Sequence, residues 1–224
     1  ETNVLKLVKG FVSWIWENVN YPYSTPHELP FYPNETLNAL EGDCDDQASL
    51  LIALSRIRGV PSYLQVGPIY TPDPTPVQLS QWEDHVQVVQ KRIRWHGWTI
   101  LYIPPWGWLP VDLTYITNIF DDPLDAIRYG AVVKQNTVQY MNYSKVDYVA
   151  VSRQARTYLL ENDFVVEMED EMRELEQNNA VTMFNTTVVV VLVLTIVVIL
   201  ASSFLTVGRW RKRPREEEVA SPLS

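Results

Sequence analysis

The fold is decided by the stretch GDCDDQASLLIALSRIRGVP, residues 42–61. It holds the only cysteine of the chain, Cys44, at the point where a turn gives way to an apolar run. Two arginines close the run, and Gly59 and Pro61 follow, a pattern typical of the end of a helix. The stretch therefore predicts a central, buried helix that begins at Cys44. Because a helix start has unpaired N–H groups and partial positive charge, we expect it to favour a thiolate.

Composition limits the class of protein. A chain of 224 residues has room for one globular domain and a smaller part. Its 18 lysines and arginines stand against 27 aspartates and glutamates, a formal net charge of -9. This balance argues against nucleic acid or an anionic membrane surface as the main partner of the folded part. A single cysteine leaves no intrachain disulfide.

The C-terminal region reads as a membrane anchor. Residues 188–207 carry no charge and are rich in Val, Leu and Ile. As a helix they would span about 30 Å, the thickness of a bilayer's hydrocarbon core. The basic cluster RWRKRPR, residues 209–215, marks the cytoplasmic side. We expect a cell-membrane protein with one membrane helix at 186–207, a cytoplasmic tail at 208–224, and residues 1–185 outside the cytoplasm.

The rest of the chain predicts an α+β fold. Helical spacing predicts an amphipathic helix over residues 4–19, and a loop rich in Pro and aromatic residues follows it. Alternation and β-rich composition predict strands at 62–66, 85–89, 99–103 and 109–112. Turns expected at 95–97 and 104–105 would join the last three into an antiparallel meander that packs on the Cys44 helix.

The remaining segments extend this core. We expect a surface loop at 70–76, helices at 124–129 and 149–161, a short strand at 164–167 and an acidic helix at 169–177. The predicted domain scheme is a catalytic core at 1–130, followed at 131–185 by an extension and an acidic membrane-proximal stalk.

Three residues could form a nucleophilic site. Cysteine-based acyl transfer needs a thiolate, an imidazole that moves the proton, and a carboxylate or amide that orients the imidazole. The chain offers Cys44 at a helix start, His85 at the start of one strand and Asp112 at the end of another. Helix, strand and strand is an order in which such groups can converge.

These segments resemble the transglutaminase-like superfamily. The nucleophile segment is GDCDD with the apolar helix and RGVP, the histidine segment is DHV (residues 84–86), and the aspartate segment is GWLPVDLT (residues 107–114). Asn20-Tyr21 and YPNET (residues 32–36) also fit the microbial and archaeal branch. The resemblance covers residues 4–130 and implies a papain-like cysteine protease fold with Cys44, His85 and Asp112 as the triad.

The chain departs from the family pattern in three places. Leu113 replaces the usual proline after the aspartate, and Val86-Gln87 replaces the common small-aromatic pair after the histidine. The stretch from His85 to Asp112 is also longer than usual, with an enlarged hairpin around residues 95–98. His96 in that turn is expected to be exposed and structural.

Neighbouring residues have alternative interpretations. A calcium loop that began at Asp43 would need Gly and Glu where Ala48 and Leu54 stand, which rejects an EF-hand. The aspartates are better explained as stabilising the helix start, although they would raise the pKa of Cys44. Trp82 and Trp108 are expected to line a substrate cleft. No metal or cofactor is implied, and one oxyanion donor is the Cys44 N–H.

The predicted function is a membrane-anchored cysteine enzyme that acts on peptide or side-chain amides through an acyl-thioester at Cys44. Its partner is a protein or peptide substrate. Hydrolysis, as a protease or amidase, is favoured because the resemblance is to the microbial branch. The triad also permits protein cross-linking by a transglutaminase, because both reactions share the thioester. A membrane-tethered binding or assembly module of the same fold is the non-enzymatic alternative.

Overall fold

The computed structural model describes residues 3–23, 27–115, 122–137, 139–144, 147–173 and 175. One compact unit runs from Glu1 to Arg173. Within the described ranges, no helix is both long and apolar enough to cross a bilayer. The predicted membrane helix (residues 186–207) and tail (208–224) lie outside these ranges.

Three helices form the N-terminal part. They are α1 (Val4–Asn18), α2 (Pro33–Ala39) and α3 (Cys44–Ile57). The first and third confirm the predicted helices. The second was not predicted, and its start is explained by Pro33 at the first helical position and by the Glu35 side chain, which accepts from the N–H of Tyr32 at 2.7 Å.

The larger sheet has four antiparallel strands in the order β5-β4-β1-β6. They are β5 (Gly107–Val111), β4 (Ile93–Ile103), β1 (Ser62–Tyr70) and β6 (Met141–Tyr143). The long strands β1 and β4 pair along nine residues, from Ser62–Leu101 to Tyr70–Ile93. This sheet and the helix that begins with the cysteine confirm the α+β, papain-like arrangement expected from the sequence.

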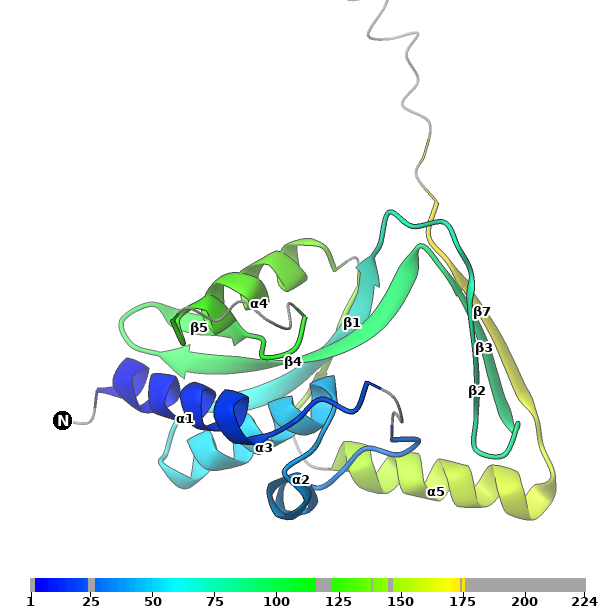
Figure 1. The fold of residues 1–224 in the computed structure, drawn as a ribbon, viewed down its shortest axis with the longest axis horizontal. Helices are drawn as coiled ribbons and strands as arrows, with labels where there is room; N and C mark the ends of the chain where they lie inside the picture. The colour runs from blue at the N-terminus through cyan, green and yellow to red at the C-terminus, as the bar shows by residue number, and fades with distance from the viewer. Residues whose placement is uncertain are drawn as a thin grey trace, which may run out of the picture. The chain divides into compact units, whose positions relative to one another are not determined.

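Helices cover both faces of this sheet (Figure 1). On one face α1 and α3 bury an apolar cluster in which Leu50 and Leu51 of α3 meet Leu101 of β4. On the other face α4 (Asp125–Gln135) packs Val133 against Trp98, which is fully buried. Each buried leucine contributes roughly 2 kcal/mol relative to an exposed one. The start of α3 is thereby held against β4.

A second sheet contains β2 (Val77–Gln81), β3 (Val86–Lys91) and β7 (Val166–Glu171), in the order β2-β3-β7. The β2–β3 pair is an antiparallel hairpin, whereas β3 and β7 run parallel. Helix α5 (Asp147–Asn162) leads into β7 and reaches the hairpin tip, where Arg156 pairs with Glu83 at 2.9 Å (Figure 1). The extension predicted for 131–185 thus supplies a strand to each sheet.

Two local predictions were wrong. The turn expected at residues 95–97 lies inside β4, and the true reversal between β3 and β4 is at Arg92, whose φ is 56°. The strand predicted to open the meander is therefore β3 of the second sheet and does not pair with β4. The acidic segment expected to be helical from residue 169 instead continues β7 to Glu171. Its backbone pairs with β3, which outweighs the local preference of a charged run for a helix.

Candidate functional site

The start of α3 is built from aspartates. Asp43 caps the helix and Asp46 closes a reciprocal capping box by accepting from the Asp43 N–H at 3.2 Å. Asp46 is buried and also accepts from the Phe31 N–H at 2.6 Å. His27 contacts it as well, at 3.4 Å from Nδ1. These bonds tie the chain before α3 to its first turn and so fix Cys44 at the first position of the helix.

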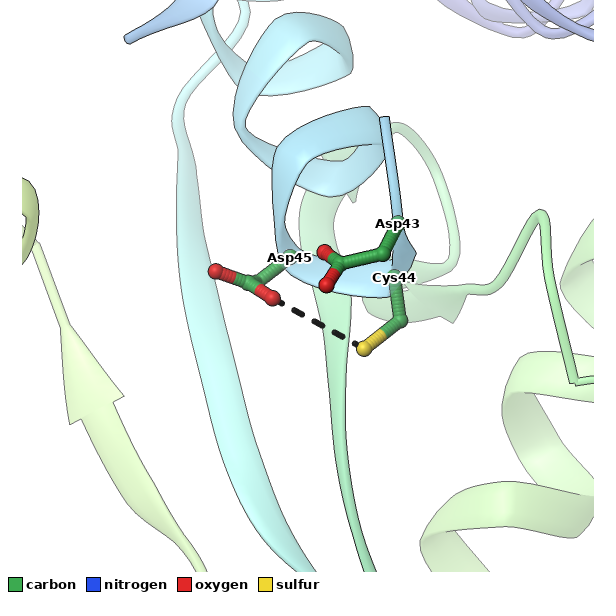
Figure 2. Close-up of side chains that lie close together, drawn as sticks. All are labelled: Asp43, Cys44 and Asp45. Atoms are coloured by element: carbon green, nitrogen blue, oxygen red, sulfur yellow. Dashed lines mark hydrogen bonds between the residues drawn. The ribbon is translucent and has the colours of Figure 1, made fainter. Parts of the chain in front are cut away.

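Two carboxylates lie beside the thiol (Figure 2). The Cys44 Sγ is 3.8 Å from Asp45 Oδ1, within reach of an S–H···O contact. The ligand atoms of Asp43, Cys44 and Asp45 lie within 4.8 Å of one another. All three come from a single helix turn, and Asp45 already accepts from the Tyr148 hydroxyl, so we assign no metal ion to them.

This environment opposes ionisation of the cysteine. Burial raises the pKa of the Cys44 thiol well above its ordinary value, and the carboxylates of Asp45, Asp43 and Asp112 raise it further. The Gly97 backbone N–H acts in the opposite direction and lowers the pKa of the thiol. The thiolate that the helix dipole was expected to favour is therefore not the resting form, since burial and the carboxylates outweigh the dipole.

A histidine and an aspartate pair closely at the larger sheet. His96 lies in β4, and its Nε2 is 2.5 Å from Oδ2 of Asp112, which directly follows β5. The His96 side chain is 11% exposed and that of Asp112 is 1% exposed. The other Asp112 oxygen, Oδ1, accepts from the N–H groups of Thr114 and Tyr115, both at 2.8 Å. This network holds the carboxylate rigidly against the imidazole.

Gly97 joins this pair to the cysteine. The first turn of α3 packs directly on it: a Cβ at this position would lie 3.0 Å from the Asp45 Cβ and 3.3 Å from the Asp45 Cα. Further along β4, the Thr99 hydroxyl donates to the Ala48 carbonyl at 3.1 Å. The residue that follows His96 therefore touches the helix start that carries Cys44, and a glycine is needed for this close approach.

His85 lies in a different part of the molecule. It ends the β2–β3 turn as a half-buried residue, and its Nδ1 is 2.8 Å from the Phe164 carbonyl. The three residues before it, Trp82, Glu83 and Asp84, all have positive φ. The predicted partner of Asp112 thus changes from His85 to His96. The expectation that His96 is exposed in a turn was wrong, because it is mostly buried within a strand.

The two tryptophans expected in a cleft are far from one another in the fold. Trp82 is at the hairpin tip and its Nε1 donates to the Glu28 carbonyl at 2.7 Å. Trp108 is half-exposed in β5, and its ring lies 5.3 Å from Tyr63 and 5.5 Å from Tyr102. In the register of β4 and β5, Trp108 stands opposite Tyr102, which is six residues from His96 along β4. Six residues of strand correspond to about 20 Å.

The sequence contained a signal for His96. The family pattern has a small residue and then an aromatic residue after its histidine, and Gly97-Trp98 supplies this pair after His96. His96 is also closer to Asp112 along the chain, so the excess length attributed to an enlarged hairpin disappears. The role of Tyr148 had no such signal. Its hydroxyl donates to Asp45 Oδ2 at 2.7 Å from a residue 103 positions away.

Comparisons with known proteins identify the family of the chain. The model of the transglutaminase-like superfamily matches residues 1–113, just over half of the 224 residues. No curated protein sequence matches the chain. Among solved structures, the chain is similar to a "putative cysteine protease" from Cytophaga hutchinsonii, with 21% identity and a TM-score of 0.33. The match covers 63% of this chain and 40% of that one, and a likeness at this level supports no further conclusion. On the family match, the chain belongs to the transglutaminase-like superfamily.

Proposed function

We propose that this protein is a cysteine enzyme that cleaves amides through an acyl-thioester, with Cys44 as nucleophile, His96 as base and Asp112 as the residue that orients His96. The observation that carries the proposal is the buried His96–Asp112 pair at 2.5 Å, next to a glycine on which the first turn of the Cys44 helix packs. A nucleophile, an imidazole and an orienting carboxylate are the three groups that such chemistry requires.

The reaction follows from the positions of these groups. Because Nε2 of His96 is hydrogen-bonded to Asp112, the other ring nitrogen, Nδ1, is the one that exchanges a proton with the thiol. Nδ1 takes the Cys44 proton as the sulfur bonds to the substrate carbonyl carbon. The proton then passes to the leaving amine as the C–N bond breaks, and an acyl-thioester remains. Water, activated by His96, releases the acid and restores the thiol.

The raised thiol pKa determines when the nucleophile forms. Cys44 rests as a thiol because of its burial and of the Asp45 and Asp43 carboxylates. Proton transfer to His96 therefore accompanies attack rather than preceding it, in contrast to an enzyme with a preformed ion pair. The Cys44 N–H, at the first position of α3, is one oxyanion donor, since no carbonyl of the same helix accepts it.

Hydrolysis is the favoured outcome, with protein cross-linking as the second candidate. One observation favours the second: the Asp45 carboxylate lies 3.8 Å from the sulfur, and a carboxylate there would attract a protonated lysine amine. A lysine acceptor would give an isopeptide bond from the same thioester. The acceptor decides between them, since both reactions share the first half.

Membrane attachment is part of the same proposal and rests on the sequence. The uncharged residues 188–207 and the basic cluster at 209–215 support a single membrane helix with the catalytic domain outside the cytoplasm. Alkaline carbonate extraction of membranes and protease treatment of intact cells test it. Retention in the membrane with cleavage of the domain from outside supports the arrangement, and release by carbonate rejects it.

The chemistry is tested by trapping the thioester. The full chain is mixed with a complex peptide mixture, quenched in acid and digested, and Cys44 is examined by mass spectrometry. Acyl adducts in the wild type that are absent in Cys44→Ala support the enzyme. Supplying a lysine-mimicking amine separates transamidation from hydrolysis. A correctly folded wild type without any adduct would favour the non-enzymatic binding module.

A further inference from the structure

Tyr148 reaches the nucleophile from outside the family-matched region. It belongs to α5, whereas the family match ends at residue 113. Its hydroxyl donates to Asp45 Oδ2 at 2.7 Å. Its ring packs against the cluster of Ala48, Ile52 and Leu64, and lies 5.2 Å from the ring of Tyr143. These contacts hold the hydroxyl in place, so the bond to Asp45 is a fixed feature of the fold.

The Asp45 carboxylate connects Tyr148 to the cysteine. One oxygen, Oδ2, accepts from the Tyr148 hydroxyl, and the other, Oδ1, lies 3.8 Å from the Cys44 sulfur. The Asp45 backbone packs on Gly97, which limits how the residue can shift. A change at Tyr148 therefore alters the surroundings of Cys44 through one side chain, that of Asp45.

Several charged or titratable groups act on Cys44, and they come from different elements. Asp43 and Asp45 stand at the start of α3, and Asp112 follows β5 with His96 of β4 as its partner. Tyr21, after α1, and Tyr148, from α5, face the same group, since burial and the nearby Cys44 and aspartates raise the pKa of each phenol. Among these groups, Tyr148 donates a hydrogen bond of 2.7 Å to the carboxylate that contacts the sulfur.

We propose that Tyr148 is a positioning residue. Its hydroxyl fixes the Asp45 carboxylate and draws the negative charge of that carboxylate away from the Cys44 thiol, so that a residue of α5 promotes formation of the Cys44 thiolate. The proposal deepens the proposed function, on which its catalytic importance rests. The effect of Tyr148 on the ionisation of Cys44 does not require a substrate and can be measured on the free protein.

The direction of the effect follows from charge. Without the Tyr148 hydroxyl, Asp45 directs more of its negative charge at Cys44, so the thiolate is disfavoured and the thiol pKa rises. Without the Asp45 charge, the thiol pKa falls. Because Tyr148 acts through Asp45, its removal has no further effect once Asp45 is neutral.

The test is the rate of Cys44 alkylation by iodoacetamide across pH 6–10, on the full chain without substrate. Tyr148→Phe keeps the packed ring and should shift the curve of labelling rate against pH to higher pH by about half a pH unit to one unit. This shift corresponds to labelling that is roughly three- to tenfold slower at pH 7.5. Asp45→Asn should move it down, and the double variant should match Asp45→Asn. Tyr143→Phe is the matched control, because its hydroxyl contacts Met141 instead, and it should match the wild type.

Other results overturn the proposal. They are an unchanged profile in Tyr148→Phe, an equal shift in Tyr143→Phe, or a double variant that adds the two single effects. If Tyr148→Phe does not fold, 3-fluorotyrosine at position 148 serves instead: its ¹⁹F resonance should shift in Asp45→Asn, and an unmoved resonance refutes the contact. Failure of the proposed function is a separate result, because it is read from acyl adducts and not from labelling.

Discussion

His85 directly precedes β3 and His96 lies within β4, and each has an aspartate for a neighbour. His85 ends an exposed turn with three successive positive-φ residues, and its ring meets a backbone carbonyl. The adjacent Asp84 accepts from the Ser80 hydroxyl and not from His85. His96 lies in a long central strand, is mostly buried and meets a carboxylate that two backbone N–H groups hold in place.

The difference shows what a site requires beyond the right residue types. Both regions offer histidine and aspartate, but only the larger sheet holds them on packed strands against the helix that carries the cysteine. A catalytic group must be kept within a fraction of an ångström of its working position, which buried strands achieve better than turns. The second sheet supplies no such support for His85.

The aspartates give the sharpest contrast between the regions. We expect Asp112→Asn to reduce formation of the Cys44 acyl adduct by at least about 100-fold, because His96 loses the acceptor that orients it. Asp84→Asn, the matched change beside His85, should leave it within about twofold. Initial rates of adduct formation by mass spectrometry measure both, and equal losses in the two variants would remove the distinction.

Glycine substitutions test whether the larger sheet must approach α3 so closely. Gly97→Ala should destabilise the fold by roughly 1–3 kcal/mol, since its Cβ would press on Asp45 at 3.0 Å. Gly10→Ala in α1, where a Cβ meets nothing within 4 Å, should instead stabilise it by about 0.5–1 kcal/mol. Thermal or urea unfolding measures both. A Gly97→Ala protein as stable as the wild type would refute the close packing.

The buried carboxylate at the helix start predicts a pH effect on stability. Burial, and then Asp45 and Asp46, raise the pKa of Asp43. The native state therefore prefers the protonated form. The stability that Asp43 contributes is complete below the ordinary carboxyl pKa of about 4 and is lost as pH rises through the higher folded-state value.

Asp43→Asn removes this titration. Compared with the variant, the wild type should lose melting temperature between pH 5 and pH 8, as measured by thermal unfolding at both values. If the melting temperature of the wild type instead rises relative to that of Asp43→Asn between pH 5 and pH 8, the raised pKa of Asp43 is contradicted.

Trp108 should give the smallest effect. It pairs with Tyr102 at the end of β4 that lies away from His96, so Trp108→Ala should leave acyl-adduct formation within about twofold. If Trp108→Ala loses most of its adducts but unfolds at the wild-type temperature, the result would support the prediction that Trp108 lines the substrate cleft.

The sequence predicted the elements whose local pattern agrees with their packing. The helix at Cys44 has an apolar run between clear start and stop residues, and α5 and β1 were likewise found. The β3–β4 turn was missed because it falls at Arg92, with φ at 56° but no Gly, Pro or Asn to mark it. Gly97 was interpreted as that turn, although its real role is to let α3 approach.

The site was predicted in part for a related reason. The motifs singled out Cys44 and Asp112 as candidates, and the structure places both near His96. The choice of His85 instead of His96 depended on the false turn, which put His96 outside the predicted strands. The Tyr148–Asp45 contact joins residues 103 positions apart, and no local pattern encodes such a pairing. Long-range contacts of this kind are fixed by tertiary packing alone.

The most direct test compares His96→Ala with His85→Ala in the acid-quenched trapping experiment. If His96 is the base, His96→Ala should form Cys44 acyl adducts about 10³-fold more slowly than the wild type. His85→Ala, which loses one exposed contact to a backbone carbonyl, should form them at the wild-type rate. His85→Ala should unfold within a few degrees of the wild type. His96→Ala should unfold at a lower temperature, because the buried Asp112 loses its partner, but it should remain folded under the assay conditions. Adducts that persist in His96→Ala and vanish in His85→Ala would contradict the account.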